Sequence, residues 1–176
     1  MNNEFTVDEI KNSVDYQWRK WQIKFLLLSL LIVAVITFFI IIIVFTSVSN
    51  ADIKFIGIGI MAWLFCMGIC VLIFLPFCLL YYGKMRYLLK NYQRFNAYET
   101  VLDNVSTSYW YRGAVYYTVI INGNGLSKRV RTNPCFSSHF ASKFSPEDFN
   151  NQKVVGLFDE DMGKFYIIKK VAEISI

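Results

Sequence analysis

The chain has 176 residues, of which 55% are hydrophobic, 18% aromatic and 18% charged, and its mean hydropathy is +0.38. Its formal charge is +5, from 18 Lys and Arg against 13 Asp and Glu, and it contains one His and four Cys. One His excludes a multi-His metal site within a single chain, and Cys in apolar sequence argues against a disulfide-stapled secreted fold. The apolar excess predicts a membrane protein.

Residues 1–24 are predicted to form an amphipathic helical segment. Apolar residues recur there at spacings of three and four, as in a helix: Val7, Ile10, Val14, Trp18, Trp21 and Phe25. Thr6 and Glu9 have the form of a capping box, so a helix is expected to begin near Val7 and to run into the first span. Its apolar stripe either lies on the membrane surface, packs against another chain, or extends the first helix into the cytosol.

Residues 25–83 are predicted to form a two-span transmembrane hairpin. No charged residue lies between Phe25 and Ala51 or between Phe55 and Gly83. About 20 apolar residues suffice to cross a hydrocarbon core about 30 Å thick, so each run is long enough to span it. Asp52 and Lys54 mark a short polar turn between the spans.

Small residues recur every four positions in the second run, at Ala62, Cys66 and Cys70. Such a stripe allows two helices to approach closely in lipid, either within the hairpin or between subunits. Pro76 follows in the same run and predicts a kink, because its ring removes a helical hydrogen bond.

Residues 84–95 are predicted to be a basic juxtamembrane linker. Lys and Arg flank both spans, with Arg19, Lys20 and Lys24 before the first and Lys84, Arg86, Lys90 and Arg94 after the second. In a bacterial-type membrane, the excess of Lys and Arg in cytoplasmic segments places both termini in the cytoplasm. The expected location is therefore the inner membrane, with the lipid bilayer as the first partner.

Residues 96–176 are predicted to form a small, mostly antiparallel β domain in the cytosol, which makes the whole chain an α+β protein. The expected strands are Glu99–Tyr109, Ala114–Ile121, Leu126–Thr132, Lys153–Asp159 and Lys164–Val171. Asn122-Gly123-Asn124-Gly125 predicts a hairpin turn, and Phe136, Phe140 and Phe144 suggest one short helix. Together these strands are expected to form a meander, and the small core of such a domain favours a homo-oligomer.

Motifs for catalysis are missing from the sequence. There is no Gly-rich phosphate loop, no Ser elbow and no paired Cys motif for zinc. We therefore expect neither an enzyme nor a cofactor or metal. The acidic run Asp159-Glu160-Asp161 lacks the ligand spacing of a calcium loop and predicts a solvated turn.

Basic and aromatic residues suggest a ligand site in the β domain. Arg129 and Arg131 are expected on one face of a strand, where two guanidinium groups match phosphate oxygens. The candidate ligand-binding residues are Arg129, Arg131, Thr132, Asn133, Arg112, Trp110 and His139. The alternative is a solvated strand whose Arg residues pair with acids while the rings fill the core. A ligand site would take a small anionic nucleotide.

The net charge does not indicate general nucleic-acid binding. Residues 84–94 hold four bases and no acid, whereas residues 95–176 hold nine bases and eight acids. Most of the positive excess therefore relates to membrane orientation, and only a local pair of Arg argues for an anionic ligand.

The layout of two spans, a basic segment and a small β domain with paired Arg resembles the membrane-anchored effectors of type III CRISPR systems that sense cyclic oligoadenylate. The resemblance implies an oligomer whose cytosolic domain binds cyclic tetra-adenylate and then perturbs or opens the membrane in antiviral defence. It carries over no binding residues. The NGNG turn followed by KVVGLFDEDMGKFYII also resembles the β domain of DUF3592-type membrane proteins.

Two other functions fit the same sequence. One is a membrane immunity protein that blocks a pore-forming toxin within the bilayer. The other is a membrane scaffold that binds a protein partner through a sheet edge.

Overall fold

The computed structural model describes residues 5–47, 53–108, 114–123, 126–133 and 148–171. The chain divides into two compact units. The first, the sheet unit, combines Met1–Arg19 with Met85–Ile176, and the second, the hairpin unit, is Lys20–Lys84. The amino-terminal segment up to Arg19 and most of the expected basic linker therefore belong to the same unit as the β domain.

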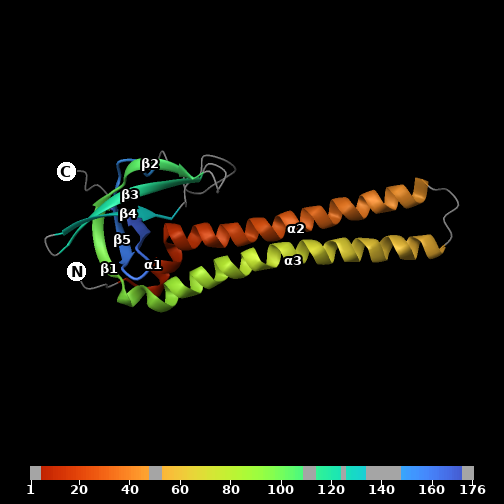
Figure 1. Ribbon diagram of the computed structural model, residues 1–176, viewed down its shortest axis with the longest axis horizontal. Coiled ribbons are helices and arrows are strands. Elements are labelled where there is room, and N and C mark those ends of the chain that lie inside the picture. Colours follow the sequence, from red (N-terminus) through yellow and green to blue (C-terminus); the bar gives the residue numbers. More distant parts are fainter. Residues whose placement is uncertain (1–4, 48–52, 109–113, 124–125, 134–147, 172–176) are drawn as a thin grey trace. The chain divides into compact units, whose positions relative to one another are not determined.

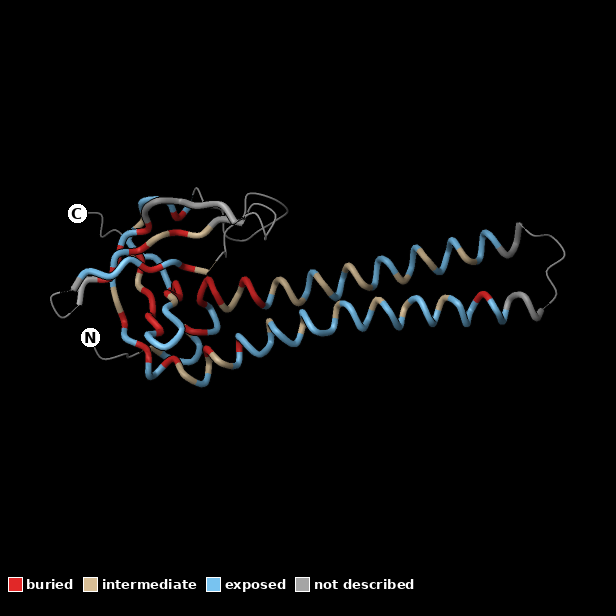
Figure 2. Tube along the Cα trace, viewed as in Figure 1, coloured by how far each residue is buried: buried red, intermediate tan, exposed pale blue. Residues whose placement is uncertain are grey.

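Two long helices make up the hairpin unit and continue into the sheet unit. Helix α2 spans Val14–Ser47 and helix α3 spans Ile53–Asn91 (Figure 1). Both are long and apolar enough to cross a membrane. Of the most apolar stretch, 0% is buried in α2 and 6% in α3. Figure 2 shows exposed residues along most of both helices. Most of their described apolar side chains are exposed.

An interhelical hydrogen bond joins α2 and α3 inside the apolar hairpin. The indole Nε1 of Trp63 donates to Thr37 Oγ1 at 3.0 Å and to the carbonyl of Ala34 at 3.3 Å. The Trp63 ring also packs edge-on against Phe38, with the ring centroids 5.5 Å apart. This contact gives the indole N–H two acceptors within the otherwise apolar hairpin.

The predicted stripe of small residues does not form the hairpin contact. Ala62 and Cys66 are exposed, and only Cys70 of the three is half-buried. The half-buried side of α3 instead carries Trp63, Met67, Cys70 and Phe74. Pro76 lies inside α3, and the helix continues beyond it to Asn91.

A short helix precedes α2 and is separated from it. Helix α1 spans Val7–Asn12 and begins with the predicted capping box, in which Thr6 Oγ1 accepts the Glu9 N–H at 3.2 Å and the Glu9 carboxylate accepts the Thr6 N–H at 3.0 Å. Ser13 then adopts an extended backbone, and its hydroxyl accepts the Tyr16 N–H at 3.3 Å. The prediction of one unbroken helix is wrong, because Ser13 ends α1 and caps α2.

The β domain is a single sheet. Its strands are β1 Asn96–Val101, β2 Asp103–Ser108, β3 Ala114–Gly123, β4 Leu126–Thr132, β5 Lys153–Asp159 and β6 Lys164–Lys170. They form a 6-stranded sheet in the order β1-β5-β6-β4-β3-β2. All neighbouring pairs are antiparallel except β4 and β6, which run parallel. The α+β architecture is confirmed.

Two details of the predicted sheet are wrong. The expected strand Glu99–Tyr109 is divided at Leu102, whose side chain is fully buried, and this break separates β1 from β2. The sheet is also not a simple meander, because β5 pairs with β1 and β6 rather than with β4. The predicted helix around Phe136, Phe140 and Phe144 lies outside the described residues.

The sheet is curled, so that β1 approaches β3. The hydroxyl of Thr100 in β1 donates to the carbonyl of Ile120 in β3 at 3.2 Å, although these strands are not neighbours in the sheet. One face of the sheet buries Tyr117, Val119 and Val130 completely or nearly so. A curl of this kind encloses a core between strands from both ends of the sheet.

The other face of the sheet is covered by the helical ends of the same unit. Its core cluster contains Ile10 of α1, Leu88 of α3, and Leu157 and Tyr166 of the sheet, together with Tyr92, Phe95, Ala97 and Ile168. Val14 and Trp18, which continue the predicted apolar stripe, are 4% and 8% exposed. The start of that stripe therefore packs within this chain, rather than on a membrane surface or on another chain.

Candidate functional site

The predicted arginine pair lies on strand β4. Arg129 and Arg131 are both exposed, whereas Val130 between them is buried. Successive strand side chains alternate between faces, so the two guanidinium groups share one face of the sheet. Their Cα partners on β3 are Ile120 and Thr118. The side-by-side placement that alternation predicts for the two arginines is confirmed.

An aromatic and an aliphatic side chain complete this face. The guanidinium of Arg131 lies over the ring of Tyr116, 5.3 Å from its centroid, which is a cation–π distance. Ile120 is 54% exposed. We name the set Tyr116, Thr118, Ile120, Arg129 and Arg131 the β3–β4 surface. Its guanidinium donors beside one aromatic ring and one aliphatic side chain suit an anion that carries a planar ring.

Within the described residues, no acid forms an ion pair with the arginines of the β3–β4 surface. Arg129 and Arg131 take part in none of the ion pairs among the described residues, which instead involve Lys11, Arg19, Lys153 and Lys169. The alternative in which both arginines pair with Glu or Asp is therefore not observed in this part of the chain.

Two of the predicted ligand residues have hydrogen-bond partners within the fold. Thr132 is 6% exposed, and its hydroxyl accepts the backbone N–H of Tyr117 at 2.9 Å. Asn133 donates its side-chain amide to Asp15 at 2.7 Å. Because Thr132 alternates with Arg131, it lies on the opposite face of the sheet from the β3–β4 surface. The other predicted ligand residues, Trp110, Arg112 and His139, lie outside the described residues.

A buried carboxylate, which the sequence analysis did not single out, ties α2 to the sheet. Asp15 is 1% exposed, and its Oδ2 accepts the backbone N–H of Ile167 in β6 at 3.0 Å. Its Oδ1 accepts the amide of Asn133 and lies 3.7 Å from the guanidinium of Arg19. Asp15 thereby holds the first turn of α2 against the point where β4 ends and β6 continues.

Arg19 is buried together with this carboxylate. It is 6% exposed, and its guanidinium lies 5.9 Å from the centroid of the Tyr166 ring. Its Nη1 is buried and has no hydrogen-bond partner within the described ranges. Arg19 was counted among the residues that orient the membrane spans, but it lies inside the sheet unit. The spacing of Asp15 and Arg19, one helical turn apart, is the sequence signal for this pair.

Burial raises the pKa of two core tyrosines. Desolvation raises the pKa of Tyr166, and the nearby Arg19 opposes this shift only in part. Desolvation also raises the pKa of Tyr117 to about 12. Both phenols are therefore protonated at neutral pH, and neither is suited to act as a base there.

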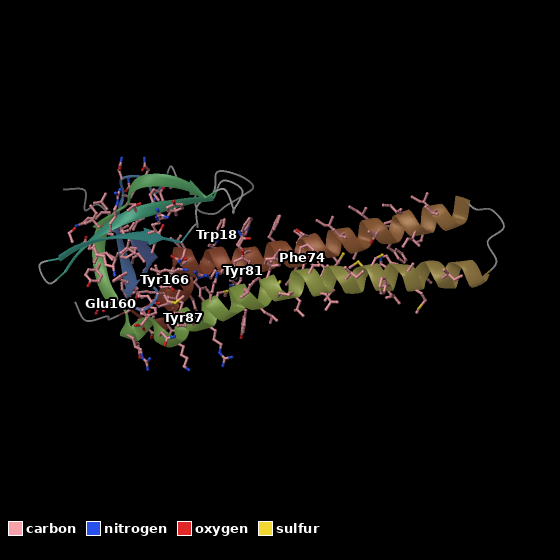
Figure 3. All side chains as sticks on the ribbon, viewed as in Figure 1. Trp18, Phe74, Tyr81, Tyr87, Glu160 and Tyr166 are labelled. Carbon is pink, nitrogen blue, oxygen red and sulfur yellow. The ribbon has the colours of Figure 1, made fainter. Side chains whose placement is uncertain are left out.

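The acidic turn after β5 is partly buried rather than wholly solvated. Asp159 is 1% exposed, accepts the hydroxyl of Tyr87 in α3 at 3.1 Å, and accepts the N–H of Met162 at 3.1 Å. Desolvation and this hydrogen bond raise the pKa of Tyr87. Figure 3 shows Tyr87 and Tyr166 among the side chains of this unit. The turn is confirmed, but Asp159 fixes the end of α3 instead of facing water.

No cluster of His, Cys, Asp or Glu that could hold a metal ion occurs among the described residues. The chain matches no protein-family model, no curated protein and no solved structure in the comparisons made with each.

Proposed function

We propose that this is a multi-pass protein of the bacterial inner membrane, with both termini in the cytoplasm. The support is the exposure of the two apolar helices, because hydrocarbon side chains this numerous are not left in water by a folded chain. The second span is followed by Lys84, Arg86, Lys90 and Arg94, which favour the cytoplasmic side.

Cysteine labelling tests this topology. In a chain whose four native Cys are replaced by Ser, single Cys at position 50, 8 or 161 would be treated with a membrane-impermeant maleimide. We expect Asn50→Cys to be labelled in intact cells, and Asp8→Cys and Asp161→Cys only after permeabilisation. Labelling of positions 8 and 161 in intact cells would contradict the orientation, and labelling of all three would contradict membrane crossing.

In this proposal the β domain binds a small anionic nucleotide on the β3–β4 surface. The observation that carries it is the pair of exposed arginines on one face, free of described carboxylates and adjoining Tyr116. Charge-assisted hydrogen bonds from guanidinium groups suit phosphate oxygens, and an aromatic face suits a base. The ligand implied by the resemblance is cyclic tetra-adenylate. Its four phosphates carry four negative charges, which the two arginines of one chain cannot neutralise. Binding therefore requires a homo-oligomer.

The response in this proposal is a perturbation or opening of the membrane in antiviral defence. Two continuous helices connect the sheet unit to the apolar hairpin. Helix α2 begins at Val14, next to the buried Asp15. Helix α3 ends at Asn91, one helical turn after Tyr87. A ligand shifts such a system only by its difference in affinity for the two states. The proposal thus requires tighter binding to one arrangement of the sheet unit.

Calorimetric titration of the full-length chain in detergent with cyclic tetra-adenylate tests the ligand. We expect R129Q/R131Q to lower affinity at least about 10-fold, since a hydrogen bond to a charged group contributes about 1.5–3 kcal/mol. The control K11Q/K153Q removes two exposed charges from the same unit and is expected to leave affinity unchanged. Absence of binding by the unmodified chain to any cyclic oligonucleotide would contradict the proposal and favour a protein partner.

A further inference from the structure

The carboxy-terminal end of α3 is amphipathic, whereas the preceding span of the same helix is apolar on all sides. Met85, Leu88 and Tyr92 are 8%, 0% and 7% exposed, and the last two belong to the core cluster against the sheet. This buried side fixes the rotation of the helix end about its axis. Any residue on the opposite side must therefore face away from the sheet.

Three cations occupy that outer side. Arg86, Lys90 and Arg94 follow one another at four-residue spacing and are all exposed. Residues four apart lie on the same face of a helix, and Arg94 ends the row in the 3-10 turn Tyr92–Arg94. We name these three residues the basic stripe. Figure 3 shows nitrogen-tipped side chains projecting from this end of α3 on the side away from the sheet.

No acid among the described residues pairs with the basic stripe. None of its members joins an ion pair in the described part of the chain. The sequence from residue 53 to residue 98 contains no Asp or Glu, so no acid relieves the repulsion within the helix. Like charges at four-residue spacing destabilise an isolated helix, and an external anion would remove that cost.

We infer that the basic stripe binds the phosphate groups of anionic phospholipids on the cytoplasmic side of the membrane. This inference rests on the proposed membrane topology. The continuity of α3 favours a lipid over a soluble anion, because the helix that carries the stripe is the second span itself. Clusters of Lys and Arg directly beside a span attract anionic headgroups, and long cationic side chains reach back toward the interface.

Distance along α3 predicts unequal contributions. Arg86 stands three residues beyond Gly83, or roughly 4.5 Å along the axis, and Lys90 stands roughly 10 Å along it. The headgroup layer on one side of a bilayer is about 5–8 Å thick. Arg86 therefore lies at headgroup depth, and Lys90 lies just beyond the layer, from where its long side chain can reach back. Arg94 lies beyond the layer, where it acts only through the screened surface potential.

Energy transfer from Trp to a labelled lipid tests the inference. The full chain would be reconstituted in phosphatidylcholine vesicles that contain a small fraction of dansyl-labelled phosphatidylglycerol or, in parallel, dansyl-labelled phosphatidylcholine. We expect labelled phosphatidylglycerol to be enriched around the protein. The variant R86Q/K90Q/R94Q should lose most of that enrichment, with R86Q the most effective single change at about five-fold, which corresponds to about 1 kcal/mol.

A charge-matched variant separates the stripe from net charge. K11Q/K153Q/K169Q also removes three cations from the sheet unit, but each of these Lys residues pairs with a carboxylate. We expect it to keep the enrichment. Equal loss in both triple variants, or release of the labelled lipid by millimolar inorganic phosphate, would overturn the assignment to a lipid site.

The same samples distinguish the two possible failures. Flotation of the vesicles on a density gradient reports whether the chain is inserted. A chain that does not float with the vesicles would overturn both the membrane topology and the lipid site. A chain that floats but shows no preference for phosphatidylglycerol would overturn the lipid site alone.

Discussion

Replacing Asp15 with Ala is expected to destabilise the sheet unit by about 3–5 kcal/mol, the usual cost of removing one partner of a buried ion pair. The change leaves the guanidinium of Arg19 buried without its countercharge, and it removes the acceptor of the Ile167 N–H and of the Asn133 amide. Since folded domains are stable by only about 5–15 kcal/mol, this is a large share of the total. Unfolding of the full chain in detergent, followed by near-ultraviolet circular dichroism, measures it.

A matched control lies seven residues earlier. Asp8 is also an acid near a helix start, but its side chain is 88% exposed and its nearest cation, Lys11, is 3.9 Å away. Asp8→Ala should therefore cost well under about 1 kcal/mol. Hydrogen exchange gives a local readout, because only the Asp15 variant should speed exchange at the Ile167 amide. Equal stability of the two variants would show that the buried network does not hold α2 to the sheet.

A further variant, Asp15→Asn, separates the charge of Asp15 from its role as a hydrogen-bond acceptor. It keeps an oxygen that can accept the Ile167 N–H but removes the charge beside Arg19. We expect a loss of stability between those of Asp8→Ala and Asp15→Ala, because the backbone acceptor is retained while the buried cation is not compensated. Removing Arg19 as well, in D15N/R19M, should restore part of the loss.

The parts of the fold that depend on local pattern were predictable from the sequence. The charge-free runs identify α2 and α3, the Thr6–Glu9 pair identifies the start of α1, and strands β4 and β5 have their predicted bounds. Each of these signals is contained within a few consecutive residues. The pairing of β4 with β6 has no such local signal, because it joins residues more than 30 positions apart in sequence. Alternation of side chains gives the face of a strand, but not its neighbour.

The candidate site was predictable only where strand alternation was enough. Arg129 and Arg131 share an exposed face for that reason alone. Thr132 and Asn133 were expected beside them because they are adjacent in sequence, yet one lies on the opposite face and the other reaches Asp15, 118 positions away. The same limit applies to Arg19, which the charge pattern places at the membrane and the folded unit buries. Burial of a polar residue depends on partners that are distant in sequence.

Replacing Gly156 with Ala is expected to destabilise the sheet unit by about 3 kcal/mol, at the upper end of overpacking effects. Gly156 lies in β5 next to a register shift and opposite Ile167 of β6. A Cβ atom there would lie 2.6 Å from the carbonyl oxygen of Tyr166 and closer still to the ring of Phe165. A backbone oxygen cannot move aside as a flexible side chain can, so the strands themselves would have to separate.

Other glycines of the chain provide controls for the same chemical change. A Cβ added at Gly83 in α3 would meet no described atom within 4 Å apart from the local helix backbone, so Gly83→Ala should be neutral or slightly stabilising. Gly163 has the same open space but a φ of +60°, so its replacement should cost about 1 kcal/mol through backbone strain alone. An effect of Gly156→Ala no larger than that of Gly163→Ala would contradict the steric argument. The ring of Phe165 provides part of the clash, so the loss of stability in G156A/F165L should be smaller than the sum of the losses in the two single variants. The clash with the carbonyl of Tyr166 remains, so the double variant should still be less stable than F165L.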